Sequence, residues 1–111
     1  MERLAEEGWL DELSAARSAV RTRGVRYGRA RVARELEARG FSRETIADAL
    51  EREGGDEREE KALRHAFERL WRARAALPGP VRRRRVFDAL TRRGFPAAKI
   101  SEIIRERHEI D

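Results

Sequence analysis

Apolar residues recur every three or four positions through most of this chain, which is the spacing of amphipathic helices. No stretch keeps the apolar–polar alternation that is typical of a half-buried strand. The pattern therefore predicts an all-α protein whose helices bury narrow apolar stripes. The expected helices cover residues 2–7, 11–23, 27–39, 42–53 and 56–76, followed by one that begins near Pro80 and one that begins at Pro96.

Polar and small residues mark the expected helix boundaries. Gly8 is expected to end the first short helix, and Asp11 to cap the N-terminus of the next. Further along, the segment "GGDEREE" breaks the chain, and Asp56 followed by Glu59 resembles a capping box that starts a long helix.

The second half of the chain repeats the first at a distance of 54 positions, which aligns Val32 with Val86 and Ile46 with Ile100. Each unit is expected to contain three helices. Thin three-helix units stabilise themselves poorly, so we expect them to stack on their neighbours in tandem. The predicted divisions are residues 1–8, the end of an incomplete first repeat, and two three-helix repeats at 9–55 and 56–111.

The motif "RGF" occurs once in each repeat, between two predicted helices. Its glycine suits the C′ position, where a helix often ends in the left-handed conformation. In such a Schellman ending the residue at C″ packs on the residue at C3. The predicted pairs are Leu36 with Phe41 around Gly40, and Leu90 with Phe95 around Gly94.

A helix-turn-helix that reads DNA sequence is an alternative interpretation of the same helix pairs. Such pairs usually have a small residue four positions before the turn glycine, where this chain has Leu36 and Leu90. The second helices, "RETIADALE" and "AAKISEIIRE", also have few groups able to read base edges. The sequence therefore favours a scaffold over a sequence-specific DNA reader.

Charge changes this picture, because 42% of the 111 residues are charged and the formal net charge is +5. Residues 17–43 contain nine arginines and two acids, and residues 69–93 contain nine arginines and one acid. Such stretches favour a polyanion or an acidic protein surface as partner. A solvated helix face is the alternative for any single arginine.

Several classes of function are excluded or disfavoured. Without cysteine the chain has no disulfide or thiolate chemistry, and His65 and His108 are too few and too far apart in sequence for a metal site. We expect no cofactor, and no nucleophile–base pair or phosphate-binding glycine loop indicates an enzyme. The sequence also has no apolar run long enough for a bilayer and no signal peptide, so a cytoplasmic protein is expected.

The candidate binding face consists of arginines on the two equivalent helices, which stacking would bring to related places on one surface. Arginine pairs bidentately with carboxylate or phosphate. Tyr27 is a candidate for stacking on bases or for a repeat interface, and Trp71 is expected at a repeat interface because it fits an apolar stripe. The candidate arginines are Arg29, Arg31, Arg34, Arg82, Arg83, Arg84 and Arg85.

Four segments together resemble the RecX family of bacterial regulatory proteins: "EEGWLDE" at 6–12, "ARSAVRTR" at 16–23, "YGRARVARELEARGFSRETIADALE" at 27–51 and "VFDALTRRGFPAAKISEII" at 86–104. The third is the most characteristic, with Gly28, Leu36 and Gly40 at the family's spacing. Two departures are Ala15, where the family usually has a bulky aromatic residue, and the short segment 1–8 in place of a first repeat.

The resemblance implies that the three-helix repeats stack into a curved, superhelical array. It further implies a non-catalytic regulator that binds the RecA–single-stranded-DNA filament and inhibits its extension, ATP hydrolysis, strand exchange and co-protease activity. It also implies a role in homologous recombination, DNA repair and the SOS response. A monomer that contacts RecA and single- or double-stranded DNA without sequence specificity is expected. The alternatives are a non-specific nucleic-acid-binding protein that acts through its arginines, and a structural adaptor with another partner.

Overall fold

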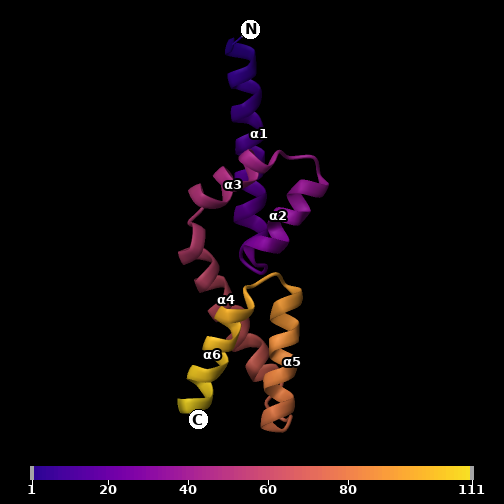
Figure 1. The fold of residues 1–111 in the computed structure, drawn as a ribbon, viewed down its shortest axis with the longest axis vertical. Coiled ribbons are helices and arrows are strands. Elements are labelled where there is room, and N and C mark those ends of the chain that lie inside the picture. Colours follow the sequence, from indigo (N-terminus) through magenta and orange to yellow (C-terminus); the bar gives the residue numbers. More distant parts are fainter. Residues whose placement is uncertain (1, 111) are drawn as a thin grey trace.

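The computed structural model describes residues 2–110, with side chains from 8 to 109, and these residues form six helices and no strand (Figure 1). The prediction of an all-α protein built from tandem three-helix repeats is confirmed. The helices are α1 (Glu2–Arg23), α2 (Arg29–Ala38), α3 (Arg43–Arg52), α4 (Gly55–Ala73), α5 (Gly79–Arg92) and α6 (Ala97–Ile110).

The two helix triplets lie end to end along a rod of 62 × 22 × 19 Å. Helices α1–α3, which we call the first repeat, occupy the upper half of Figure 1, and α4–α6, the second repeat, occupy the lower half. The N-terminal turns of α4 lead from one half to the other. The small cross-section explains the narrow apolar stripes, because each helix has only two or three neighbours to pack against.

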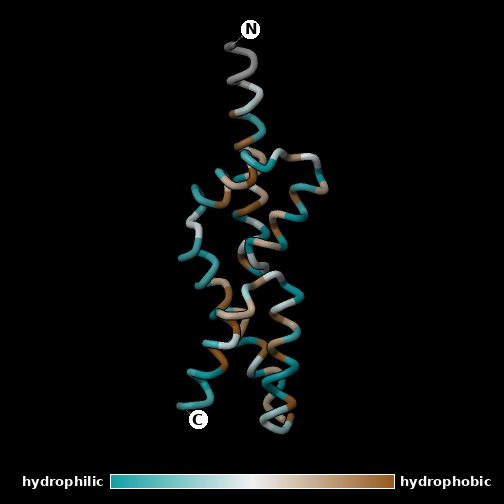
Figure 2. The backbone as a smooth tube through the Cα atoms, viewed as in Figure 1, coloured by the Kyte–Doolittle hydropathy of each residue, from teal (hydrophilic) through white to brown (hydrophobic). Residues whose placement is uncertain are grey.

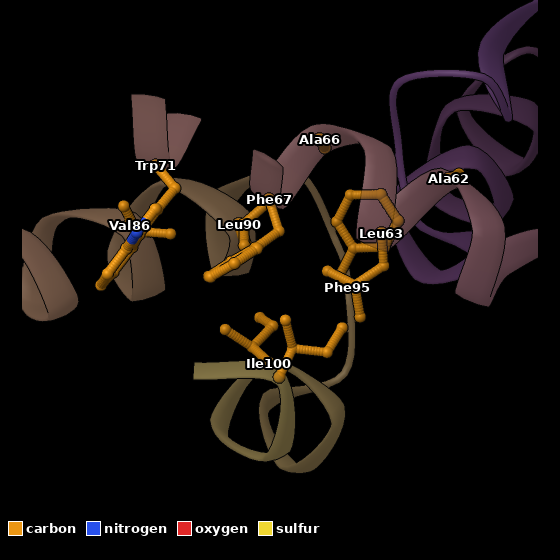
Figure 3. Packing of buried hydrophobic residues seen from close by; sticks show 10 residues of the cluster. Ala62, Leu63, Ala66, Phe67, Trp71, Val86, Leu90, Phe95 and Ile100 are labelled. Atoms are coloured by element: carbon orange, nitrogen blue, oxygen red, sulfur yellow. The ribbon is translucent and has the colours of Figure 1, made fainter. Parts of the chain in front are cut away.

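Each repeat has its own hydrophobic core. In the first repeat α1, α2 and α3 bury Leu13, Val20, Val32, Leu36 and Ile46. In the second repeat the rings and aliphatic side chains of α4, α5, α6 and the turn between them converge (Figure 3). The members of this second core are Ala62, Leu63, Ala66, Phe67, Trp71, Val86, Leu90, Phe95, Ile100 and Ile103.

Hydrophobic and hydrophilic stretches alternate along the chain (Figure 2), as the periodic pattern predicted. Within the part of the chain that the structure describes, no helix has the length and apolar character needed to cross a bilayer. The expected first turn of α5 is also confirmed, since Pro80 lies among its first residues, where its missing N–H leaves no hydrogen bond unmade.

The predicted break at Gly8 is wrong, because α1 runs without interruption from Glu2 to Arg23. Asp11 therefore lies inside a helix and caps nothing. A glycine inside a helix costs only about 1 kcal/mol relative to alanine, which the strong helix formers around Gly8 outweigh. Residues 2–8 are the first turns of α1, and their assignment to an incomplete repeat stays a prediction.

The predicted capping box at Asp56 and Glu59 is also wrong. Helix α4 begins one residue earlier, after Gly54, whose φ of 103° lies in the left-handed region. Asp56 is then part of the first helical turn, where its charge favours the helix dipole. The carboxylate of Glu59 points elsewhere: it accepts the backbone N–H of Arg29 at 2.6 Å, at the start of α2.

Both "RGF" turns form the predicted Schellman endings. Gly40 and Gly94 have φ values of 96° and 88°. The backbone N–H of Phe41 donates to the carbonyl of Leu36 at 3.1 Å, and that of Phe95 to the carbonyl of Leu90 at 3.3 Å. Because the same local sequence produces the same turn twice, the helix pairs α2–α3 and α5–α6 are copies of one unit. The two glycines nevertheless differ in their surroundings.

Candidate partner-binding surface

The contact between the two repeats, which we call the repeat junction, centres on Gly28 and Gly94. The backbone N–H of Gly28 donates to the carbonyl of Arg93 at 2.7 Å. A Cβ atom at Gly28 would lie 2.2 Å from the carbonyl oxygen of Gly94, and one at Gly94 would lie 2.5 Å from the Cβ of Arg31. Real Cβ atoms do not approach so closely, so this junction requires glycine on both sides.

Arg29, the first residue of α2, connects that helix to the start of α4. Its guanidinium lies 2.5 Å from a carboxylate oxygen of Asp56 and 3.6 Å from one of Glu51. Its Nε atom is buried without a hydrogen-bond partner among the described residues. The contacts of Arg29 thus lie at the repeat junction and are made with residues of the same chain.

Arg31 also makes intramolecular contacts. Its guanidinium lies over the ring of Tyr27, 4.1 Å from the ring centre, and donates to the backbone carbonyl of Arg92 at 3.2 Å. The guanidinium of Arg23 lies 4.3 Å from the centre of the same ring. Tyr27 is half-buried against the first core. Cation–π contacts therefore hold this ring at the junction.

The Arg23 guanidinium also pairs with Glu35 through two hydrogen bonds of 2.8 and 2.9 Å. These bonds lower the pKa of the Glu35 carboxyl and raise the pKa of Arg23, because each charge stabilises the other. The fork-shaped pair fixes the end of α1 against α2. Arg23 therefore positions Tyr27 and α2 together.

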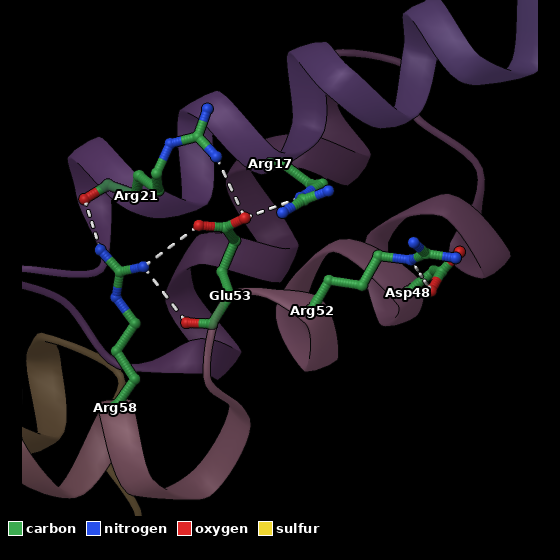
Figure 4. A network of polar contacts seen from close by, with 6 residues as sticks. All are labelled: Arg17, Arg21, Asp48, Arg52, Glu53 and Arg58. Atoms are coloured by element: carbon green, nitrogen blue, oxygen red, sulfur yellow. Dashed lines mark hydrogen bonds and ion pairs between the residues drawn. The ribbon is translucent and has the colours of Figure 1, made fainter.

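A second ion-pair cluster surrounds Glu53, which follows α3 (Figure 4). Its side chain is only 7% exposed and pairs with Arg17 at 2.7 Å and Arg21 at 3.1 Å, both on α1. Arg58 of α4 adds a contact at 3.5 Å and donates to the backbone carbonyl of Arg21 at 2.9 Å. The bond to Arg17 is the main cause of the lowered pKa of the Glu53 carboxyl.

Arg82, near the start of α5, covers Trp71. Its guanidinium lies 3.8 Å from the centre of the indole ring and donates twice to the Trp71 carbonyl, at 2.5 and 3.0 Å. Trp71 is 5% exposed and stacks on Phe67 inside the second core. The expectation that Trp71 lies at a repeat interface is therefore wrong, because Trp71 belongs to the core of the second repeat.

The arginines of the candidate binding face do not lie together on one surface. Arg29 and Arg31 lie at the repeat junction, whereas Arg82–Arg85 occupy the first turns of α5, at the opposite end of that helix (Figure 1). The reason is that α5 points its C-terminal end, not its N-terminal end, at α2. The binding role of these arginines stays a prediction.

Three of the predicted arginines remain available for a partner. Arg34, Arg84 and Arg85 are exposed and make no hydrogen bond or ion pair within residues 8–109. Arg83 is half-buried and lies 3.4 Å from a ring nitrogen of His108. Arg84 and Arg85 line a shallow hollow of about 310 Å³ together with Pro80, Val81 and Asp88.

Three further arginines, which were not among the predicted binding residues, meet in a groove beside the repeat junction. Arg26 follows α1, Arg69 lies on α4, and Arg93 follows α5. Their convergence depends on how the repeats dock, which no local pattern shows. The sequence signals were that all three lie in the two arginine-rich stretches, 17–43 and 69–93, and that Arg93 aligns with Arg39 in the two "RGF" turns. Among the described residues, no group of three or more His, Cys, Asp or Glu side chains is placed to hold a metal ion.

These features define a helical-repeat protein with exposed arginines on the described part of its surface. Residues 11–50 match the second three-helix domain of RecX, and residues 56–104 match the third. The chain belongs to the RecX family of regulatory proteins.

Curated relatives agree with this assignment. The chain is 36% identical over 104 residues to the regulatory protein RecX of Xanthomonas campestris pv. campestris, covering 90% of this chain and 60% of that protein. It is 34% identical over 115 residues to RecX of Geobacillus thermodenitrificans, covering 96% and 43%, and 30% identical over 105 residues to RecX of Chromobacterium violaceum, covering 94% and 64%. The chain thus spans less than two thirds of the length of these relatives. No solved structure matches it significantly.

Proposed function

We propose that this chain regulates the RecA recombinase by binding the RecA–single-stranded-DNA filament. Bound there, it inhibits filament extension, ATP hydrolysis, strand exchange and co-protease activity. It acts as a monomer in the cytoplasm and has no catalysis of its own. The observation that carries the proposal is membership of the RecX family through both three-helix domains.

The geometry supports a binding role for a limited set of arginines. A filament of protein and DNA presents phosphates and carboxylates, both of which accept bidentate hydrogen bonds from arginine. Arg34, Arg84 and Arg85 are free to make such bonds, whereas Arg29, Arg31 and Arg82 are occupied within the molecule. We therefore assign the first three to the partner and the last three to the scaffold.

The rod shape adds a second argument. At 62 Å the described chain is about three times as long as it is wide. A rod can follow an extended partner and contact several of its subunits, which a compact domain of the same size cannot. If the two repeats moved freely relative to each other, the rod could not follow such a partner. The ion pairs and glycines of the repeat junction therefore support binding, because they fix the orientation of one repeat relative to the other.

The test is a binding measurement by biolayer interferometry. A RecA filament is assembled on an immobilised single-stranded oligonucleotide with a non-hydrolysable ATP analogue, and the bare oligonucleotide serves as the control surface. At about 150 mM salt, where exposed charges are screened beyond ~8 Å, we expect binding to the filament to be at least about tenfold tighter than to bare DNA. Binding to neither surface would refute the proposal.

Non-specific nucleic-acid binding is the second candidate, and the unpaired arginines favour it to the same degree. It predicts equal binding to the filament and to bare single-stranded DNA. The logarithm of the binding constant would then fall with the logarithm of salt concentration with a slope of about −0.7 per phosphate contacted. The two candidate functions are thus distinguished by comparing binding to the filament with binding to bare DNA, and by repeating both measurements at several salt concentrations.

A further inference from the structure

The groove beside the repeat junction is built from both repeats. It has a volume of about 360 Å³, within the usual range of ligand sites. Arg26 and Val25 line it from the loop after α1, His65, Arg69, Leu70 and Ala73 from α4, and Arg93 from the turn after α5.

The charge of the groove is uncompensated. Arg26, Arg69 and Arg93 make no side-chain hydrogen bond or ion pair within residues 8–109, and none of the lining residues is acidic. The hollow at the start of α5 differs, because Asp88 lies among its arginines. A concave site lined by charges of one sign concentrates its field on an anion. The groove therefore fits a ligand with several negative charges.

Hydrogen bonds also hold the backbone that carries Arg26 and Arg93 in place. Arg93 is tied to the loop of Arg26 by the hydrogen bond between its carbonyl and the N–H of Gly28, only two residues further along the chain. The N–H groups of Arg26 and Tyr27 both donate to the carbonyl of Arg23, at 3.1 and 3.0 Å. A preorganised site loses less entropy when its ligand binds.

Part of the groove's lining is apolar, and this distinguishes between two kinds of anionic ligand. Val25 is 56% exposed, and Leu70 and Ala73 line the groove from α4. Single-stranded nucleic acid is usually held by aromatic rings on which its bases stack, and no Phe, Tyr or Trp lines this groove. The aliphatic side chains of the lining suit the side chain of a Leu or Phe from a peptide.

We infer that this groove binds a short acidic peptide segment of a partner protein, with carboxylates on the three arginines and one apolar side chain against Val25, Leu70 and Ala73. The inference rests on the proposed function in one respect, that the partner contains protein as well as DNA. Beyond the proposed function, the inference specifies which kind of peptide the protein partner presents and where on this chain that peptide binds.

The test uses a fluorescein-labelled ten-residue peptide in which a leucine and a phenylalanine are flanked on both sides by aspartates and glutamates. Its fluorescence anisotropy is measured with the whole chain and with the triple variant R26Q/R69Q/R93Q. The charge-matched control is R72Q/R74Q/R105Q, which removes three arginines that do not line the groove. The groove variant loses three ion pairs with the peptide, so we expect it to bind about tenfold more weakly.

We expect the control variant to bind within about threefold of the unmodified chain, since long-range attraction alone is screened by salt. A second peptide, with serines in place of the leucine and phenylalanine, should also bind more weakly. Equal losses in the two triple variants would overturn the inference, because binding would then follow net charge. If the triple groove variant fails to fold, the single variant R69Q, at an exposed position on α4, replaces it.

A labelled oligonucleotide of ten thymidines is the second probe. If it binds and loses affinity in R26Q/R69Q/R93Q while the acidic peptide does not bind, the groove is a nucleic-acid site and the inference is wrong. Neither probe contains RecA, so failure of peptide binding leaves the filament measurement unaffected. Conversely, if the chain binds the peptide but not the filament, the proposed function is refuted and the inference about the groove is not.

Discussion

Gly28 and Gly94 lie in backbone contact although 66 residues separate them, and neither has room for a side chain, because a Cβ at Gly28 would meet the Gly94 carbonyl and one at Gly94 would meet Arg31. Gly28 starts a helix of the first repeat, and Gly94 ends one of the second. Their contact places α2 end-on against the turn between α5 and α6. The glycine of the "RGF" turn thus has two roles in the second repeat, ending a helix and receiving the first repeat.

The two turn glycines give a matched pair of substitutions. Alanine at Gly40 or Gly94 must adopt the left-handed conformation, at a cost of about 1–2 kcal/mol. At Gly40 the new Cβ meets no atom within 4 Å, whereas at Gly94 it would lie 2.5 Å from the Cβ of Arg31 and 2.7 Å from its backbone nitrogen. We expect G94A to lower the free energy of unfolding by about 1–3 kcal/mol more than G40A, as measured by urea denaturation. Equal costs would contradict the junction.

The ion-pair cluster of Glu53 predicts a pH dependence. Replacing Glu53 by Gln should reduce the free energy of unfolding at pH 7 by about 1–3 kcal/mol, because three arginines lose their charged acceptor. The folded-state pKa of Glu53 is lowered from its ordinary value of 4.5, so its contribution is complete above that value and is lost as the pH falls below it.

Urea denaturation of the unmodified chain and of E53Q between pH 7 and pH 3 measures this dependence. The difference between them should shrink toward the acid end of the series. Glu102 is a suitable control, since it is exposed and has no hydrogen bond or ion pair within residues 8–109. We expect E102Q to match the unmodified chain throughout. A difference for E53Q that stayed constant with pH would show that the carboxylate charge is not responsible.

Arg82 is expected to stabilise the second repeat. Replacement by Met keeps the length of the side chain and removes both hydrogen bonds to the Trp71 carbonyl and the cation–π contact. The loss should be about 1–2 kcal/mol. The indole of Trp71 becomes more exposed, so its fluorescence emission should shift to the red. R84M, with an exposed arginine two residues away, should leave both the stability and the emission unchanged.

The exposed arginines predict a variant with a binding defect and no folding defect. R34Q/R84Q/R85Q removes three side chains that make no polar contact within the described part of the chain, so its melting temperature should stay within about 2 °C of the unmodified chain. Its affinity for the RecA filament should fall by about tenfold or more. A loss of affinity in proportion to a loss of stability would instead assign these residues to the scaffold.

Features of the fold that depend on neighbouring residues could be predicted from the sequence. The Schellman endings at Gly40 and Gly94 formed as expected because six consecutive residues determine them. The repeat could be recognised in the sequence because the same local segments occur twice. By contrast, Gly8 does not end a helix, because the helix formers on both sides outweigh the cost of a single glycine.

The candidate site was harder to predict because it depends on contacts between the repeats. In the sequence Arg29 and Arg31 look like members of a free basic face. In the structure both are occupied, Arg29 by Asp56 and Arg31 by Tyr27 and a backbone carbonyl of the second repeat. The groove of Arg26, Arg69 and Arg93 stayed hidden for the same reason, since three separate segments form it.

The central claim is that this chain inhibits the RecA filament through exposed arginines while other arginines hold its repeats together. The most direct test is the rate of ATP hydrolysis by RecA on single-stranded DNA with increasing amounts of the unmodified chain or of R34Q/R84Q/R85Q. We predict inhibition by the unmodified chain at concentrations well below that of RecA, and its loss in the variant. Undiminished hydrolysis at concentrations of the unmodified chain that coat the DNA would contradict the account.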